Sequence, residues 1–298
     1  MTMAKILLVG CGKIGTQLGL ELTENGHQCY GLKRTPSQLP SALHRIAADI
    51  TKPDTLTNLP EGLDFVVLTL TPGSADEEGY RSTYIAGLKN IIQALHQQKQ
   101  SLQRLFFISS TSIYAQHHGE WVDEYSDTNP TGYSGKVMLE AERIAQQSGY
   151  PTTRIRFSGI YGSDIRLIRW IKEGVKCPSF PVHYSNRIHQ DDCVGVLRHL
   201  IELNLSGRFP EDIYLASDSK PATYFEIIQW LRNQLQLEQQ AEQSDDTGFS
   251  LTDKVRSGSK RCSNQRLLNE GYEFRYADYR QGFAAILKNE SGQTRNNN

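Results

Sequence analysis

Apolar runs alternate with segments of helical spacing along the first part of the chain. The runs lie at residues 5–10, 27–34, 63–71, 104–114 and 152–162, and the amphipathic segments at 13–26, 80–98 and 133–148. Continuous apolar runs are typical of strands buried on both faces of a parallel sheet. Their alternation with helices predicts an α/β protein with a Rossmann doubly wound parallel sheet.

Beyond residue 162 the pattern loosens, and it predicts a small C-terminal α/β substrate lobe. We expect a Rossmann domain at 1–162 with 186–217 contributing to it, and the lobe at 163–185 and 218–290. Thr223 and Glu226 have the spacing of a capping box before a helix. Asp191 or Asp192 is expected to be the N-cap of the helix that follows. Residues 236–247 and the tail 291–298 are polar segments that we expect to be disordered.

Composition excludes several classes of protein. The 298 residues carry 32 Lys+Arg and 33 Asp+Glu, a formal net charge of −1, so neither nucleic acid nor an anionic membrane is an expected partner. No apolar run approaches the length of a membrane span, and none resembles a signal peptide. The five cysteines are scattered without metal spacing, which favours reduced thiols in a cytoplasmic protein. His117, His118 and Glu120 lack a third ligand close in sequence, so no metal is expected.

Glycines follow the first predicted strand in the pattern GxGxxG. Gly10 permits a tight turn, Gly12 allows a pyrophosphate to approach the backbone, and Gly15 allows the helix to pack closely on the strand. With Lys13 and Ile14 they predict a dinucleotide site at a helix N-terminus. The alternative is a glycine-rich turn without a ligand.

Basic residues end the second predicted strand where an NAD site would need an acid. Lys33 and Arg34 would pair with a 2′-phosphate, so we expect NADP(H) to be preferred over NAD(H). Two solvated basic side chains are the alternative. Further cofactor contacts are expected after the next two strands, from Asp49, Ile50, Thr71 and Pro72.

Four further segments occur in the order and spacing of a known family. They are "FFISSTSIYA", "TGYSGKVMLEAE", "RIRFSGIYG" and "NRIHQDDCVGVL". With the glycine motif, the chain resembles the extended and atypical short-chain dehydrogenase/reductases, the NAD(P)-dependent epimerase/dehydratase family. The resemblance implies that Ser110 holds a substrate oxygen, with Thr111 and Ser112 able to share that role. It also implies that a tyrosine acts as acid/base and that Lys136 binds the nicotinamide ribose and lowers the tyrosine pKa.

The tyrosine departs from the family spacing of YxxxK. Four residues before Lys136 stands Gly132, and Tyr133 stands three residues before it. On a helix this offset is a turn of about 100° and a shift of about 1.5 Å. Tyr133 could reach the same phenol position from a different Cα, because residues three and four apart share a face. It could equally point away and leave the site without its acid/base.

The resemblance implies hydride transfer on a small-molecule substrate with a hydroxyl or carbonyl group, with a sugar nucleotide expected by family analogy alone. Cationic residues that could bind a phosphorylated substrate are Arg156, Arg166, Arg187 and His189. The alternative is a catalytically silent NADP(H)-binding regulatory protein. The helices near 80–98 and 133–148 could form a homodimer interface or pack on the sheet, and no sequence pattern separates these cases.

Overall fold

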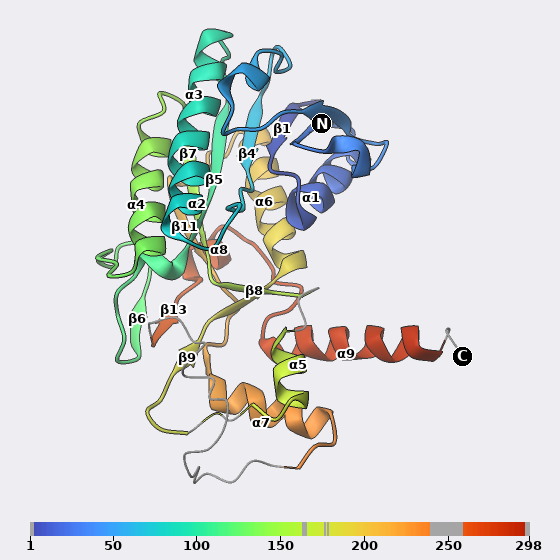
Figure 1. Cartoon of the computed structure of the whole chain (residues 1–298), viewed down its shortest axis with the longest axis vertical. Coiled ribbons are helices and arrows are strands. Elements are labelled where there is room, and N and C mark those ends of the chain that lie inside the picture. Colours follow the sequence, from blue (N-terminus) through green and yellow to red (C-terminus); the bar gives the residue numbers. More distant parts are fainter. Residues whose placement is uncertain (1–2, 163–165, 176, 178, 239–258, 296–298) are drawn as a thin grey trace. The chain divides into compact units, whose positions relative to one another are not determined.

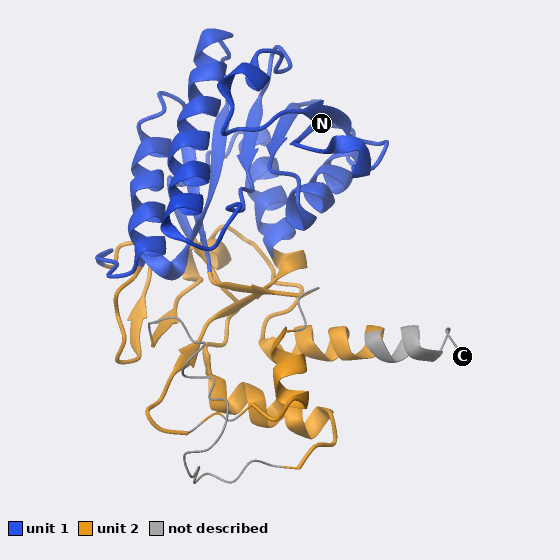
Figure 2. Ribbon diagram, viewed as in Figure 1, with its two compact units in different colours: residues 1–113, 127–157, 193–214 blue, residues 114–126, 158–192, 215–298 orange. Residues whose placement is uncertain are grey.

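Two compact units make up the chain in the computed structural model, which describes residues 3–162, 166–175, 177, 179–238 and 259–295 (Figures 1 and 2). Unit 1 comprises residues 1–113, 127–157 and 193–214, and unit 2 comprises residues 114–126, 158–192 and 215–298. Residues 114–126 cluster with unit 2, although the sequence pattern assigns them to the first domain. Residues 239–247 of the segment predicted to be disordered lie outside the described residues.

A seven-stranded sheet forms the centre of the fold, in the order β11-β7-β5-β4-β1-β2-β3. The pairs from β7 across to β3 are all parallel. This result confirms the predicted doubly wound sheet. The strands are β1 (Lys5–Val9), β2 (Gln28–Lys33), β3 (His44–Ala47), β4 (Phe65–Leu68), β5 (Arg104–Ser110), β7 (Thr152–Phe157) and β11 (Ile213–Ala216).

Helices cover both faces of this sheet. Figure 1 shows α2, α3 and α4 over one face and α1 and α6 over the other. The segment predicted as a single helix at 80–98 is three consecutive pieces, because a π-helical stretch, η3, separates α2 from α3. The bounds are α1 (Lys13–Glu24), α2 (Glu77–Arg81), η3 (Ser82–Gly87), α3 (Leu88–Gln97), α4 (Tyr133–Gln146) and α6 (Gln190–Leu205), with 3₁₀ turns η1 (Pro36–Gln38), η2 (Pro53–Leu56) and η4 (Thr111–Ile113).

Unit 2 is built from short strand pairs and helices. Its strands are β6 (Glu120–Val122), β8 (Gly159–Tyr161), β9 (Tyr184–Ser185), β10 (Arg187–His189), β12 (Ala222–Thr223) and β13 (Lys260–Cys262). Its helices are α5 (Arg166–Lys172), α7 (Tyr224–Gln234), α8 (Gln265–Asn269) and α9 (Tyr279–Arg295). The predicted capping box of Thr223 and Glu226 is confirmed at the start of α7. Helix α9 continues to Arg295, into the tail predicted to be disordered from residue 291, and residues 296–298 lie outside the described part.

The N-cap prediction for Asp191 or Asp192 is wrong. Helix α6 begins at Gln190, which places both acids in its first turn. The Asp192 carboxylate instead accepts hydrogen bonds from the Arg275 and Tyr276 amides, at 2.7 and 3.1 Å, and from the Tyr272 hydroxyl at 3.0 Å. It therefore ties the chain before α9 to the start of α6, a long-range contact that no local signal announces.

Helix α4 is fixed to the sheet by a buried ion pair. The Glu142 carboxylate accepts two hydrogen bonds from Arg156 on β7, at 3.0 and 2.8 Å, and one from the Ser109 hydroxyl on β5 at 2.6 Å. Arg156 and Glu142 are 4% and 1% exposed. A bidentate pair with its remaining partners satisfied is the geometry in which burial of two charges is tolerated. The bond holds α4 in one register against β5 and β7.

Candidate nucleotide-binding site

The glycine turn after β1 is shaped by contacts with Thr69, which follows β4. Gly10 has φ +82°, and a Cβ there would lie 2.8 Å from the Thr69 carbonyl oxygen. A Cβ on Gly15 would lie 2.7 Å from the Thr69 Oγ1 atom, whose hydroxyl donates to the Gly10 carbonyl at 2.9 Å. Both positions therefore exclude a side chain for reasons internal to the protein.

Gly12 is different, because nothing in the protein requires a glycine there. Its φ of −79° suits any residue, and the nearest atom to a Cβ would be the Gly10 carbonyl oxygen at 3.9 Å. Gly12 is the N-cap of α1, and no side chain caps this helix. Open space beside an uncapped helix N-terminus suits a pyrophosphate, which accepts hydrogen bonds from backbone N–H groups and is attracted by the helix dipole.

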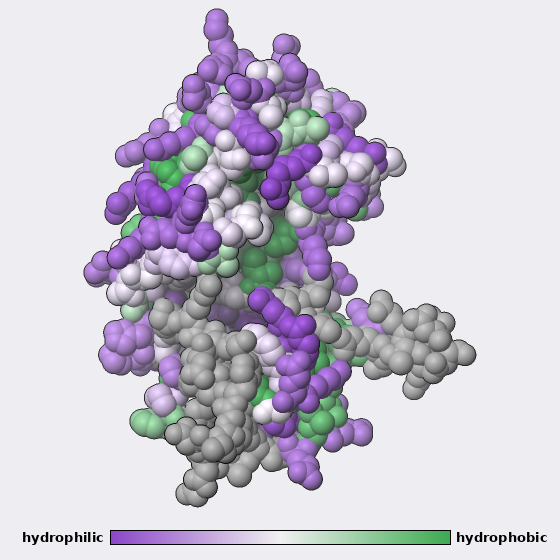
Figure 3. Space-filling model, in the orientation of Figure 1, coloured by the Kyte–Doolittle hydropathy of each residue, from purple (hydrophilic) through white to green (hydrophobic). Residues whose placement is uncertain are grey.

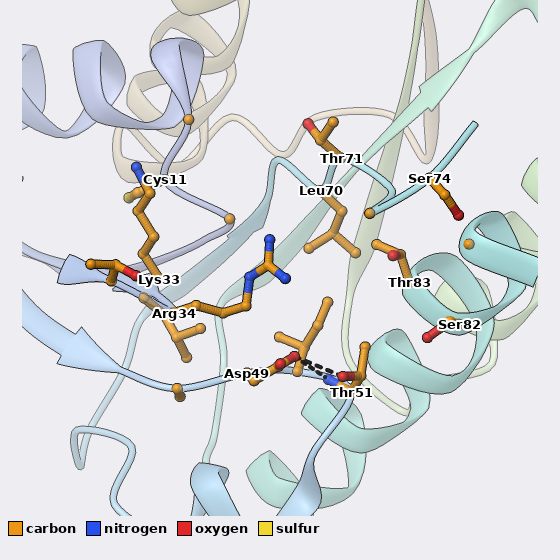
Figure 4. Close-up of a pocket in the computed structure, with 18 of the residues that line it drawn as sticks. Cys11, Lys33, Arg34, Asp49, Thr51, Leu70, Thr71, Ser74, Ser82 and Thr83 are labelled. Atoms are coloured by element: carbon orange, nitrogen blue, oxygen red, sulfur yellow. Dashed lines mark hydrogen bonds between the residues drawn. The ribbon is translucent and has the colours of Figure 1, made fainter. Parts of the chain in front are cut away.

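A pocket of about 700 Å³ opens at this turn (Figure 4). Figure 4 shows the Arg34 guanidinium projecting into its middle, with Asp49 and Thr51 on one side and Leu70 and Thr71 on another. Seven of the residues predicted to bind cofactor line it: Gly10, Gly12, Lys33, Arg34, Asp49, Ile50 and Thr71. The structure thus brings the ends of β1, β2, β3 and β4 to one pocket, at the edge where doubly wound sheets bind ligands.

The other predicted cofactor residues stand outside this lining. They are Lys13, Ile14, Gly15, Pro72 and Lys136, and Lys136 is exposed on α4. The lining also includes residues that the sequence pattern did not single out, among them Cys11, Thr35, Gln38, Ser74, Glu78, Gly79, Ser82 and Thr83. Four of these, Glu78, Gly79, Ser82 and Thr83, come from α2 and η3, whose approach to the strand ends is a tertiary feature.

Charges of both signs line the pocket. Burial alone would raise the pKa of Asp49, but hydrogen bonds from Thr51 and the charges of Arg34 and Lys52 together lower it. The Thr51 amide and hydroxyl both donate to the Asp49 Oδ1 atom, at 3.0 and 2.8 Å. Asp49 is therefore an ionised acceptor beside the cation Arg34. Burial raises the pKa of the Cys11 thiol to about 12, so this pocket thiol is protonated at neutral pH.

Ser110 ends β5 next to the first turn of α4. A Cβ on Gly135 would lie 2.4 Å from the Ser112 carbonyl oxygen, so this glycine allows α4 to pack directly on the turn after Ser110. The Ser110 hydroxyl oxygen accepts a hydrogen bond from the Ser112 amide at 3.1 Å. The structure therefore brings the Ser110 turn and the helix that carries Tyr133 and Lys136 together.

Tyr133 is the first residue of α4, and Gly132 is its N-cap. The phenol hydroxyl donates to the carbonyl of Ala75, in the loop between β4 and α2. Tyr80 packs edge-on against the Tyr133 ring, with centroids 5.5 Å apart. Ser110 and Tyr133 thus have separate hydrogen-bond partners, and they do not bond to each other.

The four residues predicted to bind substrate have different surroundings. Arg156 is committed to its ion pair with Glu142 and is buried, whereas Arg166 is exposed at the start of α5. The Arg187 guanidinium lies over the Tyr224 and Phe283 rings, at 5.5 and 5.7 Å, and its buried Nε atom has no acceptor among the described residues.

His189 is almost fully buried between aromatic rings in unit 2. It packs on Tyr161 and Tyr276, with ring centroids 5.2 and 4.2 Å away, and its Nδ1 atom lies 3.2 Å from the Asp191 amide. Burial lowers its pKa, and Asp191 partly opposes that shift. A neutral imidazole is therefore expected at neutral pH.

Asp218 is a buried acid that the sequence pattern did not reveal. It is 1% exposed and its amide donates to the Arg187 carbonyl at 2.6 Å. Its Oδ2 atom has no hydrogen-bond partner among the described residues. Burial raises its pKa to about 8, although the Lys220 amide and Arg187 lower it in part. The carboxyl is therefore protonated over much of the neutral range.

Two classes of feature are absent from the described part of the chain. It contains no cluster of three or more His, Cys, Asp or Glu side chains that could hold a metal ion, and none of its helices has the length and apolarity needed to cross a membrane.

Hydrophilic residues cover most of the visible face of unit 1 (Figure 3).

Comparison with known proteins identifies the family. A family model described as NAD(P)H-binding matches residues 10–179. A solved structure from Methylobacillus flagellatus, provisionally named an NAD-dependent epimerase/dehydratase, is 33% identical and superposes with a TM-score of 0.78, covering 97% of this chain and 100% of that one. The chain therefore belongs to the NAD(P)H-binding proteins of Rossmann fold and is related to the epimerase/dehydratase family, as its motifs predicted.

Two curated proteins are also similar. Protein YeeZ of Escherichia coli is 28% identical over 289 residues, which span 93% of this chain and 97% of that protein. A 3-beta-hydroxysteroid dehydrogenase of Mycolicibacterium neoaurum is 26% identical over 259 residues, which span 76% of this chain and 68% of that protein.

The glycine turn yields a test that separates folding from ligand binding. Gly12→Ala should change the free energy of unfolding by less than about 1 kcal/mol, because the space for its Cβ is open. It should still weaken NADPH binding more than about tenfold, since the methyl group would occupy the pyrophosphate position. Gly15→Ala, with its Cβ 2.7 Å from the Thr69 Oγ1 atom, should cost about 1–3 kcal/mol. Urea unfolding and NADPH fluorescence titration measure both quantities, and equal NADPH binding by Gly12→Ala and wild type would contradict the assignment.

Asp218 predicts how stability changes with pH. An acid whose folded pKa is raised stabilises the fold fully below its unfolded pKa of about 3.9 and loses that contribution as pH rises through the folded value of about 8. The side chain at position 218 of the variant Asp218→Asn cannot ionise. The free energy of unfolding of Asp218→Asn, relative to that of wild type, should therefore increase as pH rises from about 4 to about 8. Urea unfolding at several pH values measures the difference, with the exposed Asp54→Asn as control. A difference that stays constant with pH would show that Asp218 is ionised in the fold.

Proposed function

We propose that the chain is an NADP(H)-dependent oxidoreductase or epimerase/dehydratase. It acts by hydride transfer on a metabolite with a hydroxyl or carbonyl group, and a sugar nucleotide is the substrate class that family analogy favours. The observation that carries the proposal is the pocket itself. It joins the uncapped N-terminus of α1, beside Gly12, to Lys33 and Arg34 at the end of β2.

In this proposal, residues that follow different strands bind different parts of the cofactor. The turn of Gly10, Gly12 and Gly15, with the amides of Lys13 and Ile14, binds the pyrophosphate. Lys33 and Arg34 bind the 2′-phosphate, which a protein with an acid at that position would repel. The remaining contacts are assigned to Asp49, Ile50, Thr71, Pro72 and Lys136, with Asp49 and Ile50 at the adenine and Lys136 at the nicotinamide ribose.

Three side chains carry the chemistry. When bound, the nicotinamide supplies or accepts the hydride. Ser110 holds the substrate oxygen by a hydrogen bond, and Tyr133 gives or takes its proton. Lys136, on the same helix as Tyr133, supplies the positive charge that this proposal assigns to the nicotinamide ribose.

Substrate recognition is assigned to residues of unit 2. Arg187, with an unpartnered buried Nε atom, is the strongest of the predicted cations for a phosphorylated substrate. His189 and the exposed Arg166 are secondary candidates. Arg156 is left out of this assignment, because its guanidinium is held by Glu142 in the core of unit 1.

A catalytically silent NADP(H)-binding regulatory protein is the second candidate. The observation that favours it is the hydrogen bond from the Tyr133 hydroxyl to the Ala75 carbonyl, which occupies the proton that an acid/base would need.

Cofactor preference tests the role of the basic pair. Lys33→Ala and Arg34→Ala should each weaken NADPH binding about tenfold, because a charge-assisted hydrogen bond contributes about 1.5 kcal/mol or more. NADH binding should be nearly unchanged, since NADH has no 2′-phosphate. Lys172→Ala on α5 is the control. Titration by nicotinamide fluorescence measures both affinities. If wild type bound NADH as tightly as NADPH, or more tightly, the proposed preference would be contradicted.

Turnover separates the two functions. With NADP(H), wild type should turn over at least one member of a panel of sugar nucleotides and of hydroxyl- or carbonyl-bearing metabolites. Ser110→Ala should lower kcat on that substrate about 100-fold, while NADPH affinity stays within twofold. Nicotinamide absorbance and product chromatography follow the reaction. Tight NADPH binding without turnover on any member would favour the regulatory protein instead.

A further inference from the structure

One wall of the nucleotide pocket is a compact loop and helix. The loop after β4 and helix α2 contribute Gly73, Ser74, Glu78 and Gly79 to the lining. The Asp76 carboxylate accepts hydrogen bonds from the Gly79 amide and the Ser74 hydroxyl, both at 2.8 Å. A Cβ on Gly79 would lie 2.2 Å from the Ser74 Oγ atom, so the loop folds tightly back on α2. These contacts join the loop to the start of α2, so the wall is one connected segment.

Helix α4 holds this wall by three contacts. The Tyr133 hydroxyl donates to the Ala75 carbonyl, in the middle of the loop. The Tyr80 ring of α2 packs edge-on against the Tyr133 ring. An ion pair joins Arg81, the last residue of α2, to Glu140 of α4, with an N–O distance of 3.1 Å. Tyr133 and Glu140 are seven residues apart, so they lie on one face of the helix.

The three contacts are unequal. The side chains of Arg81 and Glu140 are 47% and 40% exposed, and an exposed ion pair of this kind contributes little. The phenol hydrogen bond is the contact that reaches the loop itself, because Ala75 stands next to the pocket residue Ser74. Helix α4 is in turn fixed to the sheet by the Glu142–Arg156 pair, so it is a firm anchor. Tyr133 is thus the principal link between that anchor and the wall.

We propose that Tyr133 is a positioning residue for the cofactor. Its phenol fastens the loop of residues 71–76 to α4 and holds the pocket wall in the form that receives the adenosine half of NADP(H). The position of Tyr133 explains this role, because the first residue of α4 points its side chain at the loop, whereas position 132 is an N-cap glycine. The inference rests on the proposed cofactor site, but it gives the phenol a task that is independent of proton transfer.

The test is the removal of one oxygen atom. Tyr133→Phe keeps the ring that Tyr80 contacts and removes only the hydrogen bond to Ala75. NADPH affinity should fall about three- to tenfold, as expected for one hydrogen bond of ordinary strength. In the protein without cofactor, amide hydrogen exchange at residues 73–83 should become about three- to tenfold faster. Glu140→Gln should change NADPH affinity less than about twofold.

Matched variants serve as controls. Tyr125→Phe removes the hydroxyl of an exposed tyrosine in unit 2, and Glu173→Gln breaks the exposed pair between Glu173 and Arg169 on α5. Neither should change NADPH affinity or the exchange at residues 73–83. A melting temperature of Tyr133→Phe equal to that of Tyr125→Phe would show that a loss of affinity does not reflect general unfolding.

Two outcomes overturn the proposal. The first is wild-type affinity for NADPH in Tyr133→Phe, and the second is unchanged exchange at residues 73–83. Failure of the proposed cofactor site has a different signature, because wild type would then bind neither NADPH nor NADH. In that case the exchange experiment alone still decides whether Tyr133 fastens the loop, since it needs no cofactor.

Discussion

The close approach of helix α1 to the end of strand β4 is the constraint on which the candidate nucleotide site depends. Thr69 lies where side chains on Gly10 and Gly15 would have to stand, and its hydroxyl bonds the Gly10 carbonyl. With glycines at both positions the helix can start directly above the sheet edge. Its N-cap residue, Gly12, lines the pocket, and no side-chain cap competes for the first N–H groups of the helix. Any residue larger than glycine at position 10 or 15 would move the helix or the strand end.

Much of this arrangement follows from local sequence. The buried strands, the end of α1 at Asn25-Gly26 and the capping box of α7 are all set by residues close together in the chain. Such features are predicted well because their physical causes lie within one or two helical turns. The same holds for Lys33, Arg34 and Asp49, whose place at a strand end puts them at the ligand edge of a parallel sheet.

Other parts of the site depend on contacts between distant segments, and sequence pattern gives no sign of them. The π-helical stretch η3 brings Ser82 and Thr83 to the pocket, although the amphipathic pattern of 80–98 continues through it unbroken. Asp192 has a preferred N-cap residue type, yet its acceptors serve the Arg275 and Tyr276 amides more than 80 residues away. Arg156 has the residue type of a phosphate ligand, but Glu142 on a neighbouring helix accepts hydrogen bonds from its Nε and Nη2 atoms. For Asp192 and Arg156 the residue type shows which interactions are chemically possible. The partner that each residue binds lies far away in the sequence and cannot be predicted from local pattern.

The offset of Tyr133 has a physical meaning that the family spacing alone does not supply. A phenol that donates to the Ala75 carbonyl cannot at the same moment donate to a substrate oxygen, so proton transfer requires that bond to break. The net contribution of an exposed hydrogen bond is about 1 kcal/mol. General acid–base catalysis contributes about 10²–10⁴-fold in rate, or roughly 3–5 kcal/mol. Breaking the contact would therefore slow a working enzyme by a factor of about five without abolishing catalysis. One hydroxyl can hold the loop while the cofactor enters and still serve the substrate afterwards, and the one-residue shift is compatible with both tasks.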